Sequence, residues 1–230
     1  MMTIPSDRLL QSGDVAPSFL LPAVNHEGNV SLDDYRGKSA VMVGFFRGFH
    51  CPFCRRHIAQ LALTRDKLAE EGVETVAIVN TPLSRARQYF QYRPTRMALA
   101  ADPEVKTHRA YGLGHIELLP DSTDPSQLQW PRTSTVAQLL ATSINPTGEL
   151  PEPMNLMAAS ELLNRRDGFE PTEADKQVQA MNPTQRTGHF LIDPKGVILW
   201  VHAEAADGPN QLAGFPSEDE MLAVARTVTR

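Results

Sequence analysis

Two cysteines, Cys51 and Cys54, are the only thiols in this chain of 230 residues, and they lie three positions apart. A disulfide across so short a loop removes little entropy from the unfolded chain, so the pair is a poor structural cross-link. A disulfide framework would also need more cysteines, spaced along the chain. The pair therefore indicates redox chemistry or half of a metal site.

The residues around the pair predict where the first thiol lies. Residues 40–46 are continuously apolar and β-prone, which is typical of a strand buried on both faces. Pro52 directly follows Cys51 and suits the first position of a helix, and apolar residues continue at a helical period to residue 69. Cys51 is thus predicted at a helix N-terminus, where free N–H groups and the helix dipole favour a thiolate.

The spacing of the two thiols assigns them different roles. One turn of helix brings Cys54 to the face of Cys51, within reach of a bond formed there. We expect Cys51 to attack and Cys54, which is more buried and less ionised, to close a disulfide. This geometry serves either a mixed disulfide or a sulfenic acid left by a peroxide. Arg47, Arg55 and a protonated His50 would add positive charge near the thiolate.

A metal site is the competing interpretation, because His50 and His57 flank the two thiols. No second CxxC or HxxxH pair exists in the sequence. Further ligands would have to come from distant single histidines, which are more often ordinary surface or core residues: His108, His115, His189 and His202. We favour redox catalysis over metal binding and over two merely structural thiols, and we expect no metal and no cofactor besides the cysteines.

The elements that carry the motif form a βαβ unit. Residues 73–79 are a second β-branched run, so a strand, a helix and a strand follow one another, which implies parallel strands with a right-handed crossover. The pattern then predicts a helix over 83–92, a strand over 97–101 and a helix over 104–111. Before the unit, residues 1–37 contain a small hairpin or lead-in strand.

Regular structure returns near the C-terminus. Residues 189–193 and 197–201 flank a Pro-Lys-Gly turn and predict an antiparallel hairpin. Ser217 and Glu220 predict a capping box at the start of a last helix. Residues 113–186, rich in Pro, Ser, Thr, Gln and Asn, are interpreted as an insertion into a single domain spanning 1–230. Its helical islands are expected at 134–143, 155–166 and 172–180.

Composition excludes several classes of protein. With 41% hydrophobic residues and a net charge of −5, the chain can bury a sizeable core and has no dominant basic patch, so we expect no nucleic-acid partner. The pairs Arg55-Arg56 and Arg165-Arg166 are interpreted as solvated helix surface. Neither a signal peptide nor a membrane-length apolar run is visible, so a cytoplasmic protein without a membrane partner is expected.

Four segments resemble one known family. The GDVAPSF opening at residues 13–19, the lead-in at 32–38, the RGFHCPFC site within 43–54 and the FLIDPKGV hairpin at 190–197 are similar to segments of the peroxiredoxin (AhpC/TSA) family. The site resembles that of a peroxiredoxin-like branch with an RGxxCPxC motif. The resemblance covers residues 13 to about 112 and about 186 to 230.

The resemblance implies an α/β, thioredoxin-like fold: a mixed central sheet flanked by helices, with a mainly helical insertion before the C-terminal hairpin. It also implies a role for Arg186, or for Arg47, in stabilising the thiolate and polarising a peroxide. The chain departs from the family at Gly44 and Gly48, where peroxiredoxins carry Pro and Thr or Ser. It also lacks the proline that thioredoxins place before the corresponding strand, where Thr187 and its neighbours lie.

Three hypotheses remain open at this stage. The first is a thiol-dependent antioxidant enzyme that reduces peroxide through Cys51 and Cys54 and is reset by a cellular dithiol. The second is a thiol–disulfide oxidoreductase acting on protein or small-molecule disulfides. The third is a redox- or zinc-responsive binding module. The family resemblance implies a homodimer for either enzyme. We expect the substrate to contact the residues around the thiols: Gly48, Phe49, His50, Pro52, Phe53 and Thr187.

Overall fold

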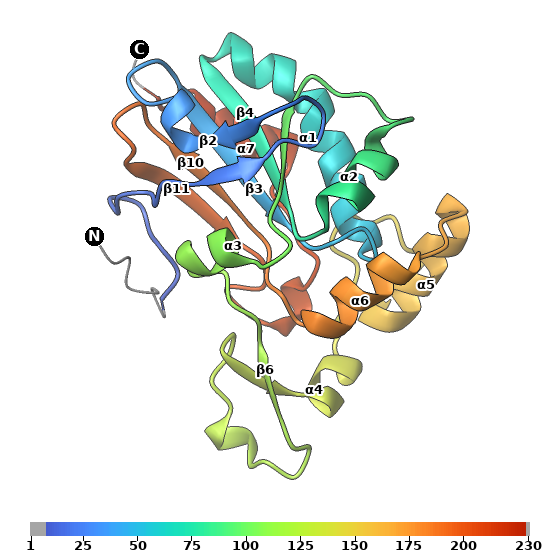
Figure 1. Cartoon of the computed structure of the whole chain (residues 1–230). Helices are drawn as coiled ribbons and strands as arrows, with labels where there is room; N and C mark the ends of the chain where they lie inside the picture. Colours follow the sequence, from blue (N-terminus) through green and yellow to red (C-terminus); the bar gives the residue numbers. More distant parts are fainter. Residues whose placement is uncertain (1–7, 229–230) are drawn as a thin grey trace.

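A five-stranded mixed sheet forms the centre of the molecule in the computed structural model, which describes residues 8–228 (Figure 1). The strand order is β11-β10-β3-β4-β5. The strands comprise β3 (Ala40–Phe46), β4 (Val73–Val79), β5 (Ala98–Ala101), β10 (Gly188–Ile192) and β11 (Ile198–Ala203). This is the predicted α/β thioredoxin-like fold.

The βαβ unit has the predicted form. Helix α1 (Pro52–Glu70) connects β3 to β4, and the two strands are parallel, with Phe46 opposite Val79 at their carboxyl ends. Every residue of β3 is buried, as expected for a strand covered on both faces. Five residues separate the end of β3 from the start of α1, so α1 begins beside the carboxyl ends of these strands.

The C-terminal hairpin also has the predicted form, and β10 pairs antiparallel with both β11 and β3. Gly188 lies opposite Phe45 and His189 opposite Gly44, which brings the chain before β10 beside the start of α1. The last helix, α7 (Glu218–Ala225), begins with the expected capping box between Ser217 and Glu220.

Alternating residues of the sheet serve two apolar cores. Met42 and Phe46 belong to a core shared with α1 and α7, whereas Val41 and Phe45 face the N-terminal segment and the end of α3. The remaining elements of the main body are the antiparallel hairpin β1 (Leu20–Pro22) and β2 (Asn29–Ser31) and the helices α2 (Leu83–Phe90) and α3 (Lys106–Ala110). Within residues 8–228, no helix is long and apolar enough to span a membrane.

Residues 113–186 add no strand to the central sheet. Their helices, drawn yellow to orange in Figure 1, lie near the positions expected: α4 (Val136–Ala141), α5 (Leu156–Asp167) and α6 (Glu173–Met181). The segment also forms two small strand pairs that the sequence did not indicate: β6 (Glu117–Leu119) with β7 (Thr133–Thr135), and β8 (Ser143–Ile144) with β9 (Met154–Asn155). These strands have two or three residues each, which is too short for an alternating pattern to be recognised.

Candidate active site

Cys51 is the N-cap residue of α1, as predicted. Its backbone is extended (φ −85°, ψ 107°), Pro52 occupies the first turn, and the Cys54 N–H donates to Cys51 Sγ at 3.2 Å. This N–H is one of the donors that a helix N-terminus leaves unpaired, so the sulfur takes the place of a capping oxygen. Both cysteines are free thiols and both are buried.

Arg47 is the cation that contacts the first thiol. Its Nη1 donates to Cys51 Sγ at 3.7 Å, and its Nε donates to the carbonyl oxygen of Gln185 at 2.6 Å. Its Nη2 forms a salt bridge with Glu204. The guanidinium therefore contacts groups from three segments: the start of α1, the chain before β10 and the chain after β11.

Glu204 was not among the predicted site residues. Its side chain is 1% exposed, and besides Arg47 it accepts hydrogen bonds from Thr187 N and Oγ1, both at 3.2 Å, and from Ala213 N at 2.6 Å. A single carboxylate between alanines after an apolar strand was the available signal, because an acidic residue is seldom buried without a partner. Thr187, expected to contact substrate, instead donates to this carboxylate.

The two thiols have opposite pKa shifts. Burial alone raises the pKa of Cys51, but the hydrogen bond from Cys54, the charge of Arg47 and the Cys54 N–H outweigh it and lower the pKa to about 6. Burial and the neighbouring Cys51 sulfur raise the pKa of Cys54 well above its usual value. Near neutral pH these shifts favour the thiolate at Cys51 and the protonated thiol at Cys54.

Two of the three cations that were expected to stabilise the thiolate, His50 and Arg55, do not do so. Burial and the charge of Arg47 lower the pKa of His50 to about 4, so this ring is neutral near pH 7. The prediction that Arg55 lies on the solvated surface was wrong, because its side chain is buried. It donates to the Phe49 carbonyl at 2.6 Å and pairs with Asp167 at 3.0 Å.

Arg186, the other predicted arginine, is buried beside the site. Burial lowers its pKa and the charge of Glu204 opposes that shift. Its Nε has no hydrogen-bond partner, and within residues 8–228 no hydrogen bond joins it to Cys51. Its backbone N–H donates to Gly114 O at 3.2 Å, which ties the start of the segment 113–186 to the chain before β10. Of the two candidates, Arg47 is the one in contact with the sulfur.

The two glycines that replace family residues lie where the chain packs closely. A Cβ on Gly48 would lie 2.8 Å from the Asn80 carbonyl oxygen and 2.9 Å from Val178 Cγ1. A Cβ on Gly44 would lie 2.8 Å from the Phe46 ring and 3.0 Å from His189 Nε2. Neither position has room for a larger side chain without a shift of its neighbours.

A cavity of about 690 Å³ opens at Cys51. Of the residues expected to contact substrate, His50 and Phe53 line it together with Arg47 and Cys51. Phe49 does not, because it is fully buried and stacked on Tyr89 with 4.1 Å between ring centroids. The remaining three predicted contacts, Gly48, Pro52 and Thr187, do not line the cavity either.

Two histidines meet behind the site. The Nε2 atoms of His57 and His189 are 3.1 Å apart, so one ring donates and the other accepts. Burial lowers the pKa of both rings, to about 3 for His57, and the pair is neutral. Within the described residues, no group of three or more His, Cys, Asp or Glu side chains is arranged to hold a metal ion.

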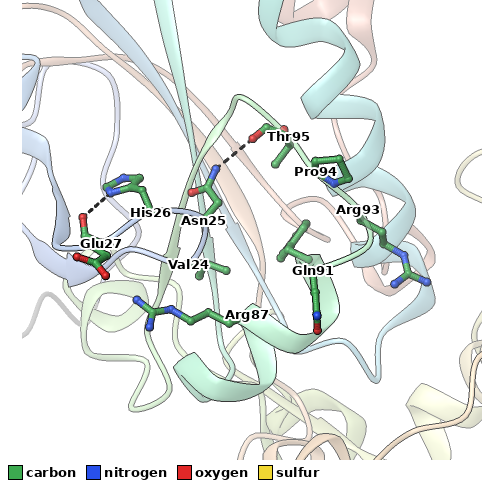
Figure 2. Close-up of a pocket in the computed structure, with 10 residues that line it drawn as sticks. Val24, Asn25, His26, Glu27, Arg87, Gln91, Arg93, Pro94 and Thr95 are labelled. Atoms are coloured by element: carbon green, nitrogen blue, oxygen red, sulfur yellow. Dashed lines mark hydrogen bonds between the residues drawn. The ribbon is translucent and has the colours of Figure 1, made fainter.

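A second cavity, of about 400 Å³, lies between the β1–β2 turn and the end of α2 (Figure 2). Figure 2 shows Asn25 reaching toward Thr95, whose carbonyl oxygen accepts its amide at 3.2 Å. None of the residues that line this cavity lines the one at Cys51. It contains no thiol, and it plays no part in the chemistry considered below.

Comparison with known proteins identifies the family of this chain. The sequence profile described as the AhpC/TSA family matches residues 12–139, more than half of the chain. The chain belongs to the AhpC/TSA family. A comparison with curated protein sequences finds no significant match.

Solved structures similar to this AhpC/TSA protein share its fold. A 2-Cys peroxiredoxin from Plasmodium vivax has a TM-score of 0.56 and 17% identity, over 94% of this chain and 80% of that one. The peroxidoxin BcpB from Mycobacterium tuberculosis gives 0.52 and 15%, over 96% and 99%. A putative thiol:disulfide interchange protein DsbE from Chlorobium tepidum gives 0.51 and 19%, over 94% and 99%. With the family, these neighbours support a thiol oxidoreductase.

Proposed function

We propose that this protein is a thiol peroxidase in which Cys51 reduces a peroxide and Cys54 resolves the product. The observation that carries the proposal is the Cys51 sulfur itself, which has a pKa of about 6 and contacts Arg47 at 3.7 Å and the Cys54 N–H at 3.2 Å. The same donors that stabilise the thiolate are placed to stabilise the negative charge that moves onto the peroxide oxygen.

The cycle balances with one external reductant. The thiolate attacks one peroxide oxygen, the S–O bond forms as the O–O bond breaks, and the leaving oxygen takes a proton as water or an alcohol. The Cys54 thiol then displaces hydroxide from the sulfenic acid, which gives a Cys51–Cys54 disulfide and water. A cellular dithiol reduces this disulfide and is itself oxidised.

The test is the second-order rate constant of the reduced protein with hydrogen peroxide, followed by tryptophan fluorescence. Trp130 is a suitable reporter, because its Nε1 donates to Ala205 O next to Glu204. A rate orders of magnitude above that of free cysteine at the same pH, and lost in Cys51→Ser, supports the proposal. A rate equal to that of free cysteine rejects it.

Thiol–disulfide exchange is the second candidate, and the closeness of the two thiols favours it. Cys54 keeps its proton and lies one turn from Cys51, which suits the release of a mixed disulfide as well as the closure of a sulfenic acid. Reduction of insulin disulfides at a rate above that of free dithiothreitol would support this activity. No turnover in that assay would reject it.

A further inference from the structure

The side chain of His50 lies at the thiol site with one ring nitrogen unpaired. His50 lines the cavity at Cys51, and its Nδ1 is buried without a hydrogen-bond partner among residues 8–228. Buried polar atoms in folded proteins are nearly always paired. An unpaired ring nitrogen beside the reacting sulfur is therefore available to a molecule that enters the cavity.

A tight turn brings this ring close to both Gly48 and the thiol. The Cys51 N–H donates to the Gly48 carbonyl oxygen at 3.1 Å, so residues 48–51 form one β-turn with His50 at its third position. A Cβ on Gly48 would lie 3.1 Å from His50 Nδ1. The nitrogen therefore borders the space that a side chain at position 48 would need, which is the position where peroxiredoxins carry Thr or Ser.

The turn also holds the ring in place. Phe49, the second residue of the turn, is fully buried and stacks on Tyr89. Its carbonyl oxygen accepts a hydrogen bond from Arg55 at 2.6 Å. The backbone is thus fixed before His50 by these contacts and after it by the start of α1 at Cys51. A donor that is positioned in advance needs no reorganisation when the reaction begins.

The His50 ring is uncharged at the pH where the thiolate forms. Burial lowers the pKa of His50 to about 4, and the charge of Arg47 acts in the same direction. The charge of Asp175 opposes this shift and that of Arg55 adds to it. A neutral imidazole carries one proton, on either nitrogen, and it can donate a hydrogen bond without transferring that proton to a nearby anion.

The other N–H groups at the sulfur already have partners. Among the lining residues from the main body, Arg47 and His50 carry side-chain N–H groups. Arg47 donates to Cys51 Sγ and pairs with Glu204. The Cys54 N–H donates to the same sulfur. Because these donors serve the thiolate, the His50 ring is left to serve an atom bound next to it.

We infer that the neutral His50 ring donates a hydrogen bond from Nδ1 to the leaving oxygen of a peroxide at Cys51. This inference rests on the proposed peroxidase function and names a further catalytic residue for it. As the Cys51 thiolate forms the S–O bond, the O–O bond breaks and negative charge builds up on the leaving oxygen, where the His50 N–H stabilises it. That oxygen then takes a proton from solvent, and His50 keeps its own.

The test compares two reactions of the same thiolate in the full-length reduced protein, one with hydrogen peroxide and one with iodoacetamide. Iodide leaves in the second reaction and needs no hydrogen-bond donor, so that rate constant reports on the thiolate alone. His50→Phe keeps an aromatic ring and removes the N–H. It should lower the ratio of the peroxide to the iodoacetamide rate constant about ten- to a hundredfold, which corresponds to one hydrogen bond to a charged group.

Two amide variants identify the nitrogen. The side-chain nitrogen of asparagine is bonded to Cγ, as Nδ1 of histidine is, whereas that of glutamine lies one bond further out, near the position of Nε2. His50→Asn should therefore keep most of the wild-type ratio. His50→Gln should lose about as much as His50→Phe.

The outcomes separate the role of His50 from the function. A ratio that falls in His50→Phe and His50→Gln, and not in His50→Asn, supports the inference. A ratio that is unchanged in His50→Phe, or equally low in all three variants, overturns it and leaves the peroxidase function standing. Equal losses in both reactions would show that His50 only holds the thiol in place, and would overturn it as well. A wild-type peroxide rate no faster than that of free cysteine overturns both.

The protonation of the ring can be measured without the reaction. Nitrogen-15 NMR of histidine-labelled protein distinguishes the two neutral tautomers from each other and from the charged ring. The signal that is lost in His50→Asn identifies His50 among the seven histidines. We expect the reduced wild-type protein at pH 7 to carry the proton of this ring on Nδ1. A proton on Nε2 alone, or a charged ring, would overturn the inference whatever the rate constants are.

Discussion

The buried salt bridge between Arg47 and Glu204 offers a test of how the site is held together. Replacement of Arg47 by Met removes the cation and leaves the carboxylate buried, with Thr187 and Ala213 as its remaining donors. Removal of one partner of a buried pair costs about 3–5 kcal/mol of unfolding free energy. Since a folded domain has only about 5–15 kcal/mol in total, the loss is large enough for a urea titration to detect.

The double variant Arg47→Met/Glu204→Gln removes both charges. Neutral groups that replace a whole buried ion pair are often no less stable than the pair. The amide of the new glutamine has one acceptor oxygen, which can accept from Thr187, whereas its NH2 group then faces the Ala213 N–H, which donates to the other carboxylate oxygen in the wild type. Because an unpaired buried charge costs more than one lost hydrogen bond, we expect the double variant to be more stable than Arg47→Met by about 1–2 kcal/mol.

The pKa of Cys51 should respond differently from the free energy of unfolding in these two variants. Arg47 lowers the pKa of Cys51, so its loss raises that pKa in the single and the double variant alike. A thiol with a pKa of about 6 is about 90% thiolate at pH 7, whereas one with the ordinary value of about 8.5 is about 3% thiolate. A less acidic thiol is a stronger nucleophile once ionised, which offsets most of this, so the change in ionisation alone should lower the peroxide rate at pH 7 about two- to threefold. The loss of the Arg47 charge beside the peroxide should lower the rate further.

Urea midpoints give the stabilities, and the ultraviolet absorbance of the thiolate against pH gives the pKa of Cys51. The thiolate titration is best made in a Cys54→Ser background, where a single thiol is present. Three results would refute the reasoning: Arg47→Met as stable as the wild type, a double variant no more stable than the single one, or an unchanged pKa of Cys51.

Three further outcomes are expected. Cys54→Ser should let Cys51 react once and stop as a sulfenic acid, seen as a dimedone adduct by mass spectrometry; a full catalytic cycle in this variant would exclude Cys54 as the resolving thiol. Gly48→Thr should lower stability by about 1–3 kcal/mol, and addition of Val178→Ala should return part of it, because Val178 Cγ1 lies 2.9 Å from the position of the new Cβ. Burial lowers the pKa of His57 to about 3 and that of His189 well below its usual value. Below pH 6.5 the unfolded chain therefore binds more protons than the folded one, and the free energy of unfolding should fall as the pH drops from 6.5 toward 3, by up to about 1.4 kcal/mol per pH unit for each ring. Urea midpoints at pH 7 and 5 should show a smaller fall in His57→Phe than in the wild type.

The sequence predicts those parts of the site that depend on neighbours in the chain. Pro52 can occupy the first turn of a helix and not its interior, so it determines that α1 begins at Cys51. The buried strand before it and the three-residue spacing to Cys54 then determine which thiol is ionised. The capping box between Ser217 and Glu220 is local in the same sense, and the structure contains it as expected.

What the sequence did not reveal depends on contacts between distant segments. Glu204 lies 157 positions beyond Arg47, and nothing in its neighbourhood indicates that partner. Arg55 looks like one half of a charged surface pair, yet it is buried and contacts Asn164 and Asp167 of α5. Periodicity reports which face of a helix is polar, and it does not report which other segment will cover that face.

The glycine at position 48 connects the chemistry to the insertion. Where other members of the family are expected to carry a hydroxyl, the space beside Gly48 is taken by the Asn80 carbonyl and by Val178 of α6. Helix α6 is fixed there by the salt bridge between Arg85 and Asp175. A residue of the segment 113–186 therefore occupies part of the space that a side chain at position 48 would need. The donors to the Cys51 sulfur are Arg47 and the Cys54 N–H.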